Sequence, residues 1–395
     1  MKIYGITGTN GKTTTTWILG EFLRAGCRGA AASRPTGLVT TVEVRTGTRA
    51  FSSGYTTPPL KALKEILAEM RRNGLVNCVM EVSSHAIHQR RTGNVRFAGG
   101  GFTNLTQDHL DYHRTMERYF QAKADFFRRL AASTPGAPAA VCVDGAYGAR
   151  LARICRRHSL RLVTCGRSAE AEVRASGLEV SPDGNVFELT LGGETRRVSC
   201  PLAGAYNVEN VLVAAALAYG AGVAPERIFE TIPLLAPRWG RLERVPCAAK
   251  ATVFVDYAHT DDALANVLGT VRAFTPGEVW AVFGAGGDRD RTKRPKMGRA
   301  AAAKADRLVV TSDNPRTEDP RAIIGEILAG VPADAKTKVL SDRAEAIAWA
   351  LAHAKRGDSV VVCGKGHETT QTIGTVKIPF DDRLQVAAWT PERKR

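Results

Sequence analysis

The chain has 395 residues, 44% hydrophobic and 24% charged, which is typical of a folded protein of about two or three domains. We find no run of about eighteen apolar residues and no leader segment, so we expect a cytoplasmic protein without a membrane partner. Its eight cysteines form no Cys-x-x-Cys pair and its net charge of +16 lacks a long basic tract, which argues against zinc sites, disulfides and nucleic-acid binding.

The first predicted element is an apolar strand at residues 2–6, followed by the turn TGTNGKTTTT at residues 7–16 and a helical pattern. In such a turn backbone N–H groups surround phosphate oxygens, the lysine supplies positive charge, and a threonine hydroxyl can reach magnesium. The loop is shorter than the usual P-loop, because Ile6 stands where that loop has glycine. Against the alternative of a plain structural turn, the order of these residues predicts a nucleotide site that uses Gly8, Asn10, Gly11, Lys12, Thr13 and Thr14.

Apolar strands and amphipathic helices then alternate, as in a doubly wound parallel sheet. We expect helices at residues 60–72, 116–130 and 207–219, and strands at 76–82, 97–104, 139–143 and 161–165. Residues 173–190 and 194–198 contain Asp-Gly and Gly-Gly breaks, which favour antiparallel hairpins at a sheet edge.

A break in both periodicities at residues 233–240 predicts a domain boundary. Beyond it we expect strands at residues 251–255, 279–284, 307–311 and 359–363, with helices between them. The fold class is therefore α/β. We predict a P-loop-type doubly wound ATPase domain at residues 1–236 and a smaller Rossmann-like domain at residues 237–395.

Polar residues follow several of these strands, at the sheet edge where such folds bind ligands. Glu81 ends one strand and can bind magnesium beside a nucleotide, although the serines after it can simply cap a helix. His109 lies in a run of two histidines and two aspartates that can bind metal or merely form hydrogen bonds. Lys123, on a mostly apolar helix face, would by itself extend to solvent. Asp256 follows a strand of the second domain and can hold a ribose hydroxyl.

Taken together, these segments, through Phe-Asp-Asp-Arg at residues 380–383, closely resemble the Mur ligase family, in its diaminopimelate-adding branch. The resemblance implies that ATP phosphorylates a carboxylate and that an amino acid then displaces the phosphate to form an amide. The implied reaction joins meso-diaminopimelate to UDP-N-acetylmuramoyl-L-alanyl-D-glutamate in peptidoglycan synthesis. The alternative keeps this chemistry with an acceptor that lacks UDP, such as a free peptide or a specialised metabolite. We expect a monomer that binds these small molecules.

The resemblance also assigns roles to individual residues. Lys12 would contact the transferring phosphate, and two magnesium ions would be held by Thr13, Glu81, His109 and Lys123, the lysine being carbamylated. The ATP-binding set would further include Asn207, Asn210, Arg241, Asp256 and His259. Acceptor-binding residues would be Thr56, Thr57, Ser83 and Arg91. The amino-acid site would contain Arg289, Asp313, Asn314, Arg316, Gly364 and Glu368, since a guanidinium can grip a carboxylate in bidentate fashion. The alternative for Arg316 is a surface ion pair.

Two departures from the family pattern stand out. Asp261 occupies the place of a proline in Tyr-Ala-His-Thr-Pro-Asp, which we expect to alter loop stiffness more than chemistry. The family's members of this branch also carry a uridine-binding domain before the phosphate loop. Four alternatives follow for this chain. The remaining domains hold the uridine nucleotide of the acceptor, or a separate acceptor-binding protein holds it. Otherwise the acceptor is a different molecule, or the sequence begins too late.

Overall fold

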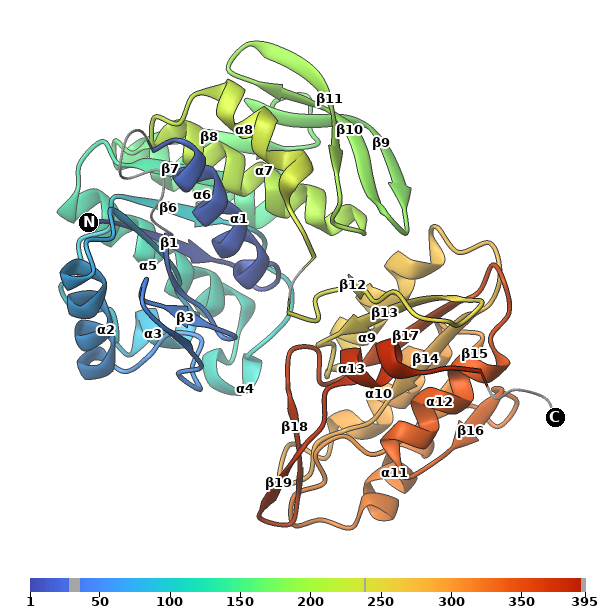
Figure 1. The fold of residues 1–395 in the computed structure, drawn as a ribbon. Helices are drawn as coiled ribbons and strands as arrows, with labels where there is room; N and C mark the ends of the chain where they lie inside the picture. The colour runs from blue at the N-terminus through green and yellow to red at the C-terminus, as the bar shows by residue number, and fades with distance from the viewer. Residues whose placement is uncertain (28–35, 238, 392–395) are drawn as a thin grey trace. The chain divides into compact units, whose positions relative to one another are not determined.

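The computed structural model describes residues 1–27, 36–237 and 239–391. These residues form two compact units, each built on its own β-sheet (Figure 1). Unit 1 comprises Met1–Glu179, Asn185–Cys200 and Ala205–Leu235, and unit 2 comprises Val180–Gly184, Pro201–Gly204 and Ala236–Arg395. The α/β class predicted from the sequence is confirmed.

The sheet of unit 1 has eleven strands in the order β11-β10-β9-β8-β7-β6-β1-β5-β2-β3-β4. Their bounds are β1 Lys2–Thr7, β2 Gly37–Val39, β3 Val44–Arg45, β4 Ala50–Phe51, β5 Asn77–Glu81, β6 Gly99–Phe102, β7 Pro138–Cys142, β8 Arg161–Gly166, β9 Val173–Ser181, β10 Gly184–Leu191 and β11 Glu194–Cys200. Neighbouring strands from β9 through β2 are parallel, whereas β10 and β11 pair antiparallel. The expected hairpin at the sheet edge is therefore confirmed.

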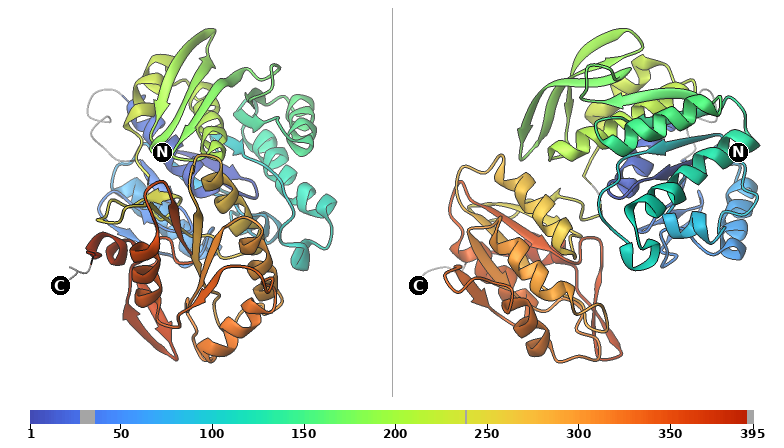
Figure 2. Two further views of the ribbon diagram at one scale, coloured as in Figure 1. Left: turned by 90° about the vertical axis from the view of Figure 1, so that its right-hand side faces the viewer. Right: turned by 180° about the vertical axis from the view of Figure 1, so that it is seen from behind.

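Helices cover both faces of this sheet. On one face lie α1 (Lys12–Ala25) and α7 (Ala205–Gly220), with α8 (Pro225–Thr231) and the short 3-10 helix η2 (Ile232–Leu234) following α7 (Figure 1). On the other lie α2 (Leu60–Arg72), α5 (Met116–Ser133) and α6 (Ala146–Arg157), and the view from behind shows α5 across the strands (Figure 2). Two short helices, α3 (Ser84–His88) and α4 (Leu110–His113), follow β5 and β6. The helices thus leave the carboxyl ends of β1, β5 and β6 to the loops.

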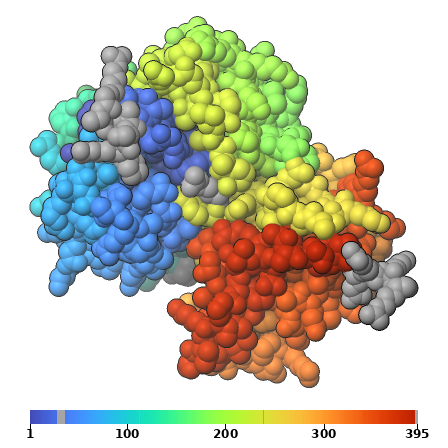
Figure 3. Space-filling model, in the orientation of Figure 1, coloured from blue at the N-terminus to red at the C-terminus, as the bar shows by residue number. Residues whose placement is uncertain are grey.

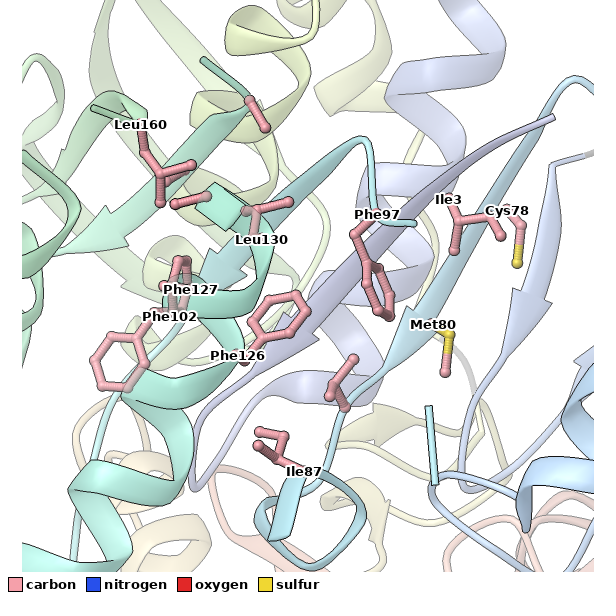
Figure 4. Close-up of a cluster of buried hydrophobic side chains, with 14 of the residues drawn as sticks. Ile3, Cys78, Met80, Ile87, Phe97, Phe102, Phe126, Phe127, Leu130 and Leu160 are labelled. Carbon is pink, nitrogen blue, oxygen red and sulfur yellow. The ribbon is translucent and has the colours of Figure 1, made fainter. Parts of the chain in front are cut away.

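The core under α5 explains why β6 is glycine-rich. Phe97 and Phe126 meet edge to face with centroids 5.0 Å apart, and Figure 4 shows both rings within the buried cluster. A Cβ on Gly100 would lie 2.7 Å from Cε1 of Phe126. A larger residue at Gly100 would therefore push α5 away from the sheet, whereas Gly99 and Gly101 face Leu217 of α7 on the other side.

Unit 2 has a six-stranded sheet in the order β12-β13-β17-β14-β15-β16. The strands are β12 Glu243–Arg244, β13 Thr252–Asp256, β14 Val279–Phe283, β15 Arg307–Val310, β16 Thr337–Val339 and β17 Ser359–Cys363, and all pairs except β12–β13 are parallel. The helices are α9 Asp261–Arg272, α10 Lys293–Ala302, α11 Pro320–Leu328, α12 Arg343–His353 and α13 Asp382–Ala388. The four longer strands agree with the sequence prediction.

A separate hairpin of β18 (Thr370–Ile373) and β19 (Val376–Pro379) follows β17. Ile373 and Val376 are 48% and 61% exposed, and this C-terminal part of the chain, drawn in red, lies at the surface of unit 2 (Figure 3). Among the described helices, none is both long and apolar enough to span a bilayer.

A buried ion pair fixes two strand ends of unit 2. Arg343 and Asp382, both fully buried, make two hydrogen bonds of 2.7 Å, from Nε to Oδ1 and from Nη2 to Oδ2. The same guanidinium donates to the carbonyl oxygens of Ser312 and Cys363. Ser312 follows β15 and Cys363 ends β17. The ion pair therefore fixes the point at which the loop after each of these two strands begins.

Candidate active site

The phosphate loop of unit 1 connects β1 to α1 and is braced by the residues that follow β6. The backbone N–H of Asn10 donates to Oδ1 of Asn104 at 2.9 Å, and Oγ1 of Thr103 donates to the carbonyl of Asn10 at 2.7 Å. Gly8 and Gly11 both have positive φ, and a Cβ on Gly8 would lie 1.9 Å from Oγ1 of Thr103. The loop therefore needs glycine at these positions for two reasons: a side chain on Gly8 would collide with Thr103, and both residues have a positive φ that other residues rarely adopt.

Lys12 opens α1, and its side chain turns back over this loop. Its Nζ donates to the carbonyl of Thr9 at 2.7 Å and of Gly8 at 3.1 Å. Thr13 and Thr14 follow it in the first turn of the helix, Thr13 buried and Thr14 half-buried. A positive charge thus lies at the helix N-terminus, an arrangement that suits an anionic ligand.

Glu81 is buried at the end of β5, beside Thr13. Oγ1 of Thr13 donates to Oε1 of Glu81 at 2.8 Å, and the backbone N–H of Thr41 donates to the same oxygen at 2.8 Å. A hydroxyl and a carboxylate are therefore in direct contact next to the phosphate loop. These are oxygen ligands of the kind that Mg²⁺ prefers, so the pair fits a magnesium ion.

Lys123 is almost completely buried on α5. Its Nζ donates to the carbonyl of Gly8 at 2.7 Å and lies 4.4 Å from the centre of the Tyr119 ring. Burial, with a further contribution from the charge of Lys12, holds the pKa of this amine well below its usual value. The expectation that the side chain would extend to solvent is therefore wrong, because its nitrogen points to the phosphate loop.

His109 lies near this region in a group of histidines. It has a positive φ of 53°, faces Asp108 at 3.4 Å, and its ring centre lies 4.8 Å from that of His85. Within the described parts of the chain, no three His, Cys, Asp or Glu side chains are grouped closely enough to hold a metal. Of the four residues predicted to bind magnesium, Thr13 and Glu81 are the pair in direct hydrogen-bond contact.

His113, in the same group, predicts a pH-dependent stability. Burial, with the nearby charges of His85 and Lys123 as smaller causes, lowers its pKa to about 4. At a pH between about 6.5, the usual histidine pKa, and about 4, the unfolded chain binds a proton at this histidine and the folded chain does not. The free energy of unfolding therefore falls as the pH falls through this range. We expect wild type to lose more thermal stability than His113→Gln between about pH 7 and about pH 5. Melting curves of both proteins test this, and equal losses would contradict it.

The residues predicted to bind the acceptor gather around the end of β5. Oγ1 of Thr57 donates to the carbonyl of Glu81 at 2.9 Å and accepts the N–H of Ser83 at 3.1 Å. Nη1 of Arg91 donates to the carbonyl of Thr57 at 3.3 Å, and Thr56 accepts a hydrogen bond from Thr41. The Ser83 hydroxyl also caps α3, since it accepts the N–H of Ala86. The capping alternative for this serine is thus correct, while its proposed contact with an acceptor stays a prediction.

Asn207 and Asn210 are buried on α7 beside the start of α1. Nδ2 of Asn210 donates to Oδ1 of Asn207 at 2.9 Å, and Oδ1 of Asn210 accepts from Oγ1 of Thr15 at 3.2 Å. A Cβ on Gly11 would lie 2.0 Å from that same amide oxygen. The pair therefore packs directly against the phosphate loop, and its predicted contact with adenine remains a prediction.

In unit 2, the carboxylate of Asp256 is buried at the end of β13. It accepts the N–H of Leu242 at 2.6 Å and of Ala258 at 2.8 Å, and burial raises its pKa. The Arg241 guanidinium lies 4.7 Å from the centre of the Tyr257 ring, and the His259 ring lies 4.6 Å from the same ring. Arg241, Tyr257 and His259 therefore form one group, and the charge of Arg241 also acts on Asp256.

Lys293 was not predicted from the sequence, yet it joins this group. Its Nζ donates to the carbonyl of His259 at 3.0 Å. Burial lowers the pKa of this lysine, and Asp313 opposes that shift. A basic residue close to both the His259 loop and the Asp313 loop is a candidate for binding an anionic ligand.

The departure at Asp261 has a local explanation. Asp261 is the first residue of α9, after Thr260, whose hydroxyl accepts the N–H of Ala263 and caps the helix. Proline is favoured at the first position of a helix because its missing N–H would be unpaired there, and an acidic residue is favoured there by the helix dipole. Either residue therefore fits the fold at this position.

The predicted amino-acid residues come together at the ends of β14, β15 and β17. Nδ2 of Asn314 donates to Oε2 of Glu368 at 2.8 Å, and Nη1 of Arg316 donates to the carbonyl of Gly287 at 2.6 Å. A Cβ on Gly364 would lie 2.3 Å from Oδ2 of Asp313, so these two loops are in close contact. Arg289 is exposed beside them and donates to the carbonyl of Asp288. Within the described residues, the Arg316 side chain donates to a carbonyl and not to a carboxylate. The alternative of a surface ion pair is therefore not supported.

Family profiles match both units. The profile of the Mur ligase middle domain matches residues 6–218, and the profile described as Mur ligase, glutamate ligase domain matches residues 240–366. A UDP-N-acetylmuramoyl-L-alanyl-D-glutamate--2,6-diaminopimelate ligase from Synechococcus sp. (strain WH7803) is 43% identical over 390 residues, which is 98% of this chain and 76% of that protein.

Solved structures show the same likeness. The structure of a UDP-N-acetylmuramoyl-L-alanyl-D-glutamate--2,6-diaminopimelate ligase, 33% identical, aligns with a TM-score of 0.69 over 98% of this chain and 77% of that one. A folylpolyglutamate synthase from Thermotoga maritima aligns with a TM-score of 0.67 at 17% identity, covering 92% of this chain and 86% of that one. The second likeness shows the shared fold alone.

Proposed function

The chain belongs to the Mur ligase family of ATP-dependent acid–amino-acid ligases, and from this premise we propose that it adds meso-diaminopimelate to UDP-N-acetylmuramoyl-L-alanyl-D-glutamate. The observation that carries the choice of amino acid is the grouping of Asn314, Arg316 and Glu368 at one edge of the unit 2 sheet. Arg316 lies two residues after Asn314, whose amide contacts Glu368, and a guanidinium and a carboxylate on such neighbouring segments suit a ligand that bears both a carboxylate and an amine at its far end.

The reaction proceeds in two displacements. The acceptor carboxylate attacks the γ-phosphorus of ATP, and the bond to the bridging oxygen breaks to release ADP and leave an acyl phosphate. The amine of the amino acid then attacks the acyl carbon, loses a proton and expels inorganic phosphate, which leaves an amide. Lys12, which lies over the phosphate loop, is placed to balance charge on the transferring phosphate.

Members of this family use ATP and Mg²⁺, and the contact between Thr13 and Glu81 in unit 1 fits one such ion. We assign one ion to Thr13 and Glu81, whose oxygens are in contact, and a second to Glu81, His109 and a carbamylated Lys123. Bound magnesium would offset negative charge on the phosphate oxygens. Support for the modification comes from burial, because burial favours the neutral form of an amine, and that form can attack the carbon of CO₂ and lose a proton to become an anionic carbamate.

An activity assay separates this function from its near rival, a ligase with an acceptor that lacks UDP. We expect the protein to release phosphate from ATP when diaminopimelate and the UDP-linked dipeptide are both present. Replacing diaminopimelate by lysine should lower the rate, because lysine lacks the carboxylate that the Arg316 guanidinium can bind. Activity only with an acceptor without uridine would favour the rival, and no release with any acceptor would contradict both.

A further inference from the structure

The hairpin β18–β19 holds the backbone of the segment Asp313–Arg316. The N–H of Arg316 donates to the carbonyl of Thr372 at 3.1 Å, and the carbonyl of Arg316 accepts the N–H of Gly374 at 2.7 Å. Nε2 of Gln371 donates to the carbonyl of Asp313 at 2.6 Å. Arg316 has a φ of 51°, which is uncommon for a residue other than glycine, so the contacts from β18 maintain a backbone shape that it would rarely adopt alone.

Lys365 holds the side chains of the same region. It is fully buried, and its Nζ donates to the carbonyl of Thr370 at 2.6 Å, to Oε2 of Glu368 at 3.0 Å and to Oδ1 of Asn314 at 3.3 Å. An ammonium group has three donors, and these three acceptors account for all of them. Lys365 therefore links Asn314, Glu368 and the start of the hairpin through one atom.

These contacts fix which way the Asn314 amide faces. Its Oδ1 accepts from Lys365 and from the N–H of Thr372 at 2.9 Å, and both partners are donors. The amide nitrogen must then point to Oε2 of Glu368, where it lies 2.8 Å away. Both side-chain hydrogen bonds that the described residues give Glu368 reach Oε2, so this oxygen holds the carboxylate in place and neither bond engages Oε1.

We propose that Lys365 is a positioning residue for amino-acid selection. We also propose that β18 holds the segment Asp313–Arg316, which selects the amino acid, in its binding shape. This inference rests on the proposed function, which places the amino acid at Asn314, Arg316 and Glu368. Lys365 itself is covered by its three acceptors and does not touch the substrate. It acts by fixing the amide of Asn314 and the carboxylate of Glu368 in one arrangement.

Kinetics of the variant Lys365→Met test the proposal, because methionine keeps most of the side-chain volume and removes the donors. We expect the KM for diaminopimelate to rise about tenfold, since Asn314, Glu368 and the Thr370 carbonyl each lose a hydrogen-bond donor, while the KM for ATP changes by less than about twofold. The preference for diaminopimelate over lysine should fall as well. Lys377→Met, on the exposed strand β19, is the matched control and should behave as wild type.

A second variant, Gln371→Leu, decides the matter if Lys365→Met does not fold, because it removes only the bond to the Asp313 carbonyl. It should raise the KM for diaminopimelate in the same direction with the KM for ATP unchanged. Unchanged KM and selectivity in the folded variants would overturn the inference, and so would equal losses for both substrates. If wild type uses another amino acid, the proposed function fails, and the same comparison made with that amino acid still tests Lys365.

Discussion

Replacing Lys12 by methionine is expected to lower the rate of phosphate release by about a hundredfold to a thousandfold. Its Nζ lies over the phosphate loop, within hydrogen-bond distance of the carbonyls of Gly8 and Thr9. A fixed cation there stabilises negative charge that builds on the transferring phosphate, and this benefit is larger in the transition state than in the bound substrate. The loss should therefore appear mainly in kcat, measured as phosphate release at saturating ATP, acceptor and amino acid.

The matched control for this experiment is Lys61→Met, since Lys61 is an exposed lysine on α2. That variant should retain the wild-type rate. Calorimetry with ATP shows whether the Lys12 variant still binds nucleotide. A Lys12 variant that binds ATP and turns over at the wild-type rate would contradict the role assigned to this residue.

Much of the fold could be predicted because the longer strands can be recognised from the apolar residues of their own local sequence. β1, β5 and β7 are mostly buried and β8 is partly buried, and their order along the chain with helices between them indicates a parallel sheet. The strands β2, β3, β4, β12 and β16 have only two or three residues each, so no pattern of hydrophobicity can be recognised in them. Their place in the sheets depends on pairing with distant strands, which the local sequence does not specify.

The hairpin β18–β19 is different, since its signal was present in the sequence. Residues 370–379 read TQTIGTVKIP, two short β-prone runs around a glycine, and Gly374 has a φ of 59° in the turn. Such a pattern is typical of a hairpin with a tight turn. The hairpin was not among the predicted elements, because each of its strands has only four residues and lies beyond the last long strand.

Residues of the candidate site could be predicted from the sequence where they lie at the ends of strands. Glu81, Asp256 and Asp313 all end or follow parallel strands, and the structure places each at the edge expected for a ligand. Lys293 could not be found in this way, and although Lys365 does follow the end of β17, its role depends on a contact with a residue far away in the sequence. Lys293 meets the carbonyl of His259, and Lys365 meets Asn314.

The second large effect is expected at Lys123. Truncation to alanine should lower phosphate release by about a hundredfold or more, because it removes both the bond to the Gly8 carbonyl and the proposed anionic ligand. Two readings of this loss are possible: Lys123 supports the phosphate loop as an amine, or it acts as a carbamate. Lys123→Gln keeps a donor for the loop and should remain active under the first reading alone.

Restoring the anion distinguishes the two readings directly. The alanine variant has a cavity beside the phosphate loop in place of a fully buried side chain, and a small carboxylate such as acetate can enter it. If a carbamate is the working group, acetate should restore part of the activity of Lys123→Ala and none to Lys12→Met. Wild type equilibrated with ¹³C-bicarbonate should also show a carbamate resonance that Lys123→Ala lacks. An active glutamine variant, together with a wild type that shows no carbamate resonance, would mean that the amine serves only to hold Gly8.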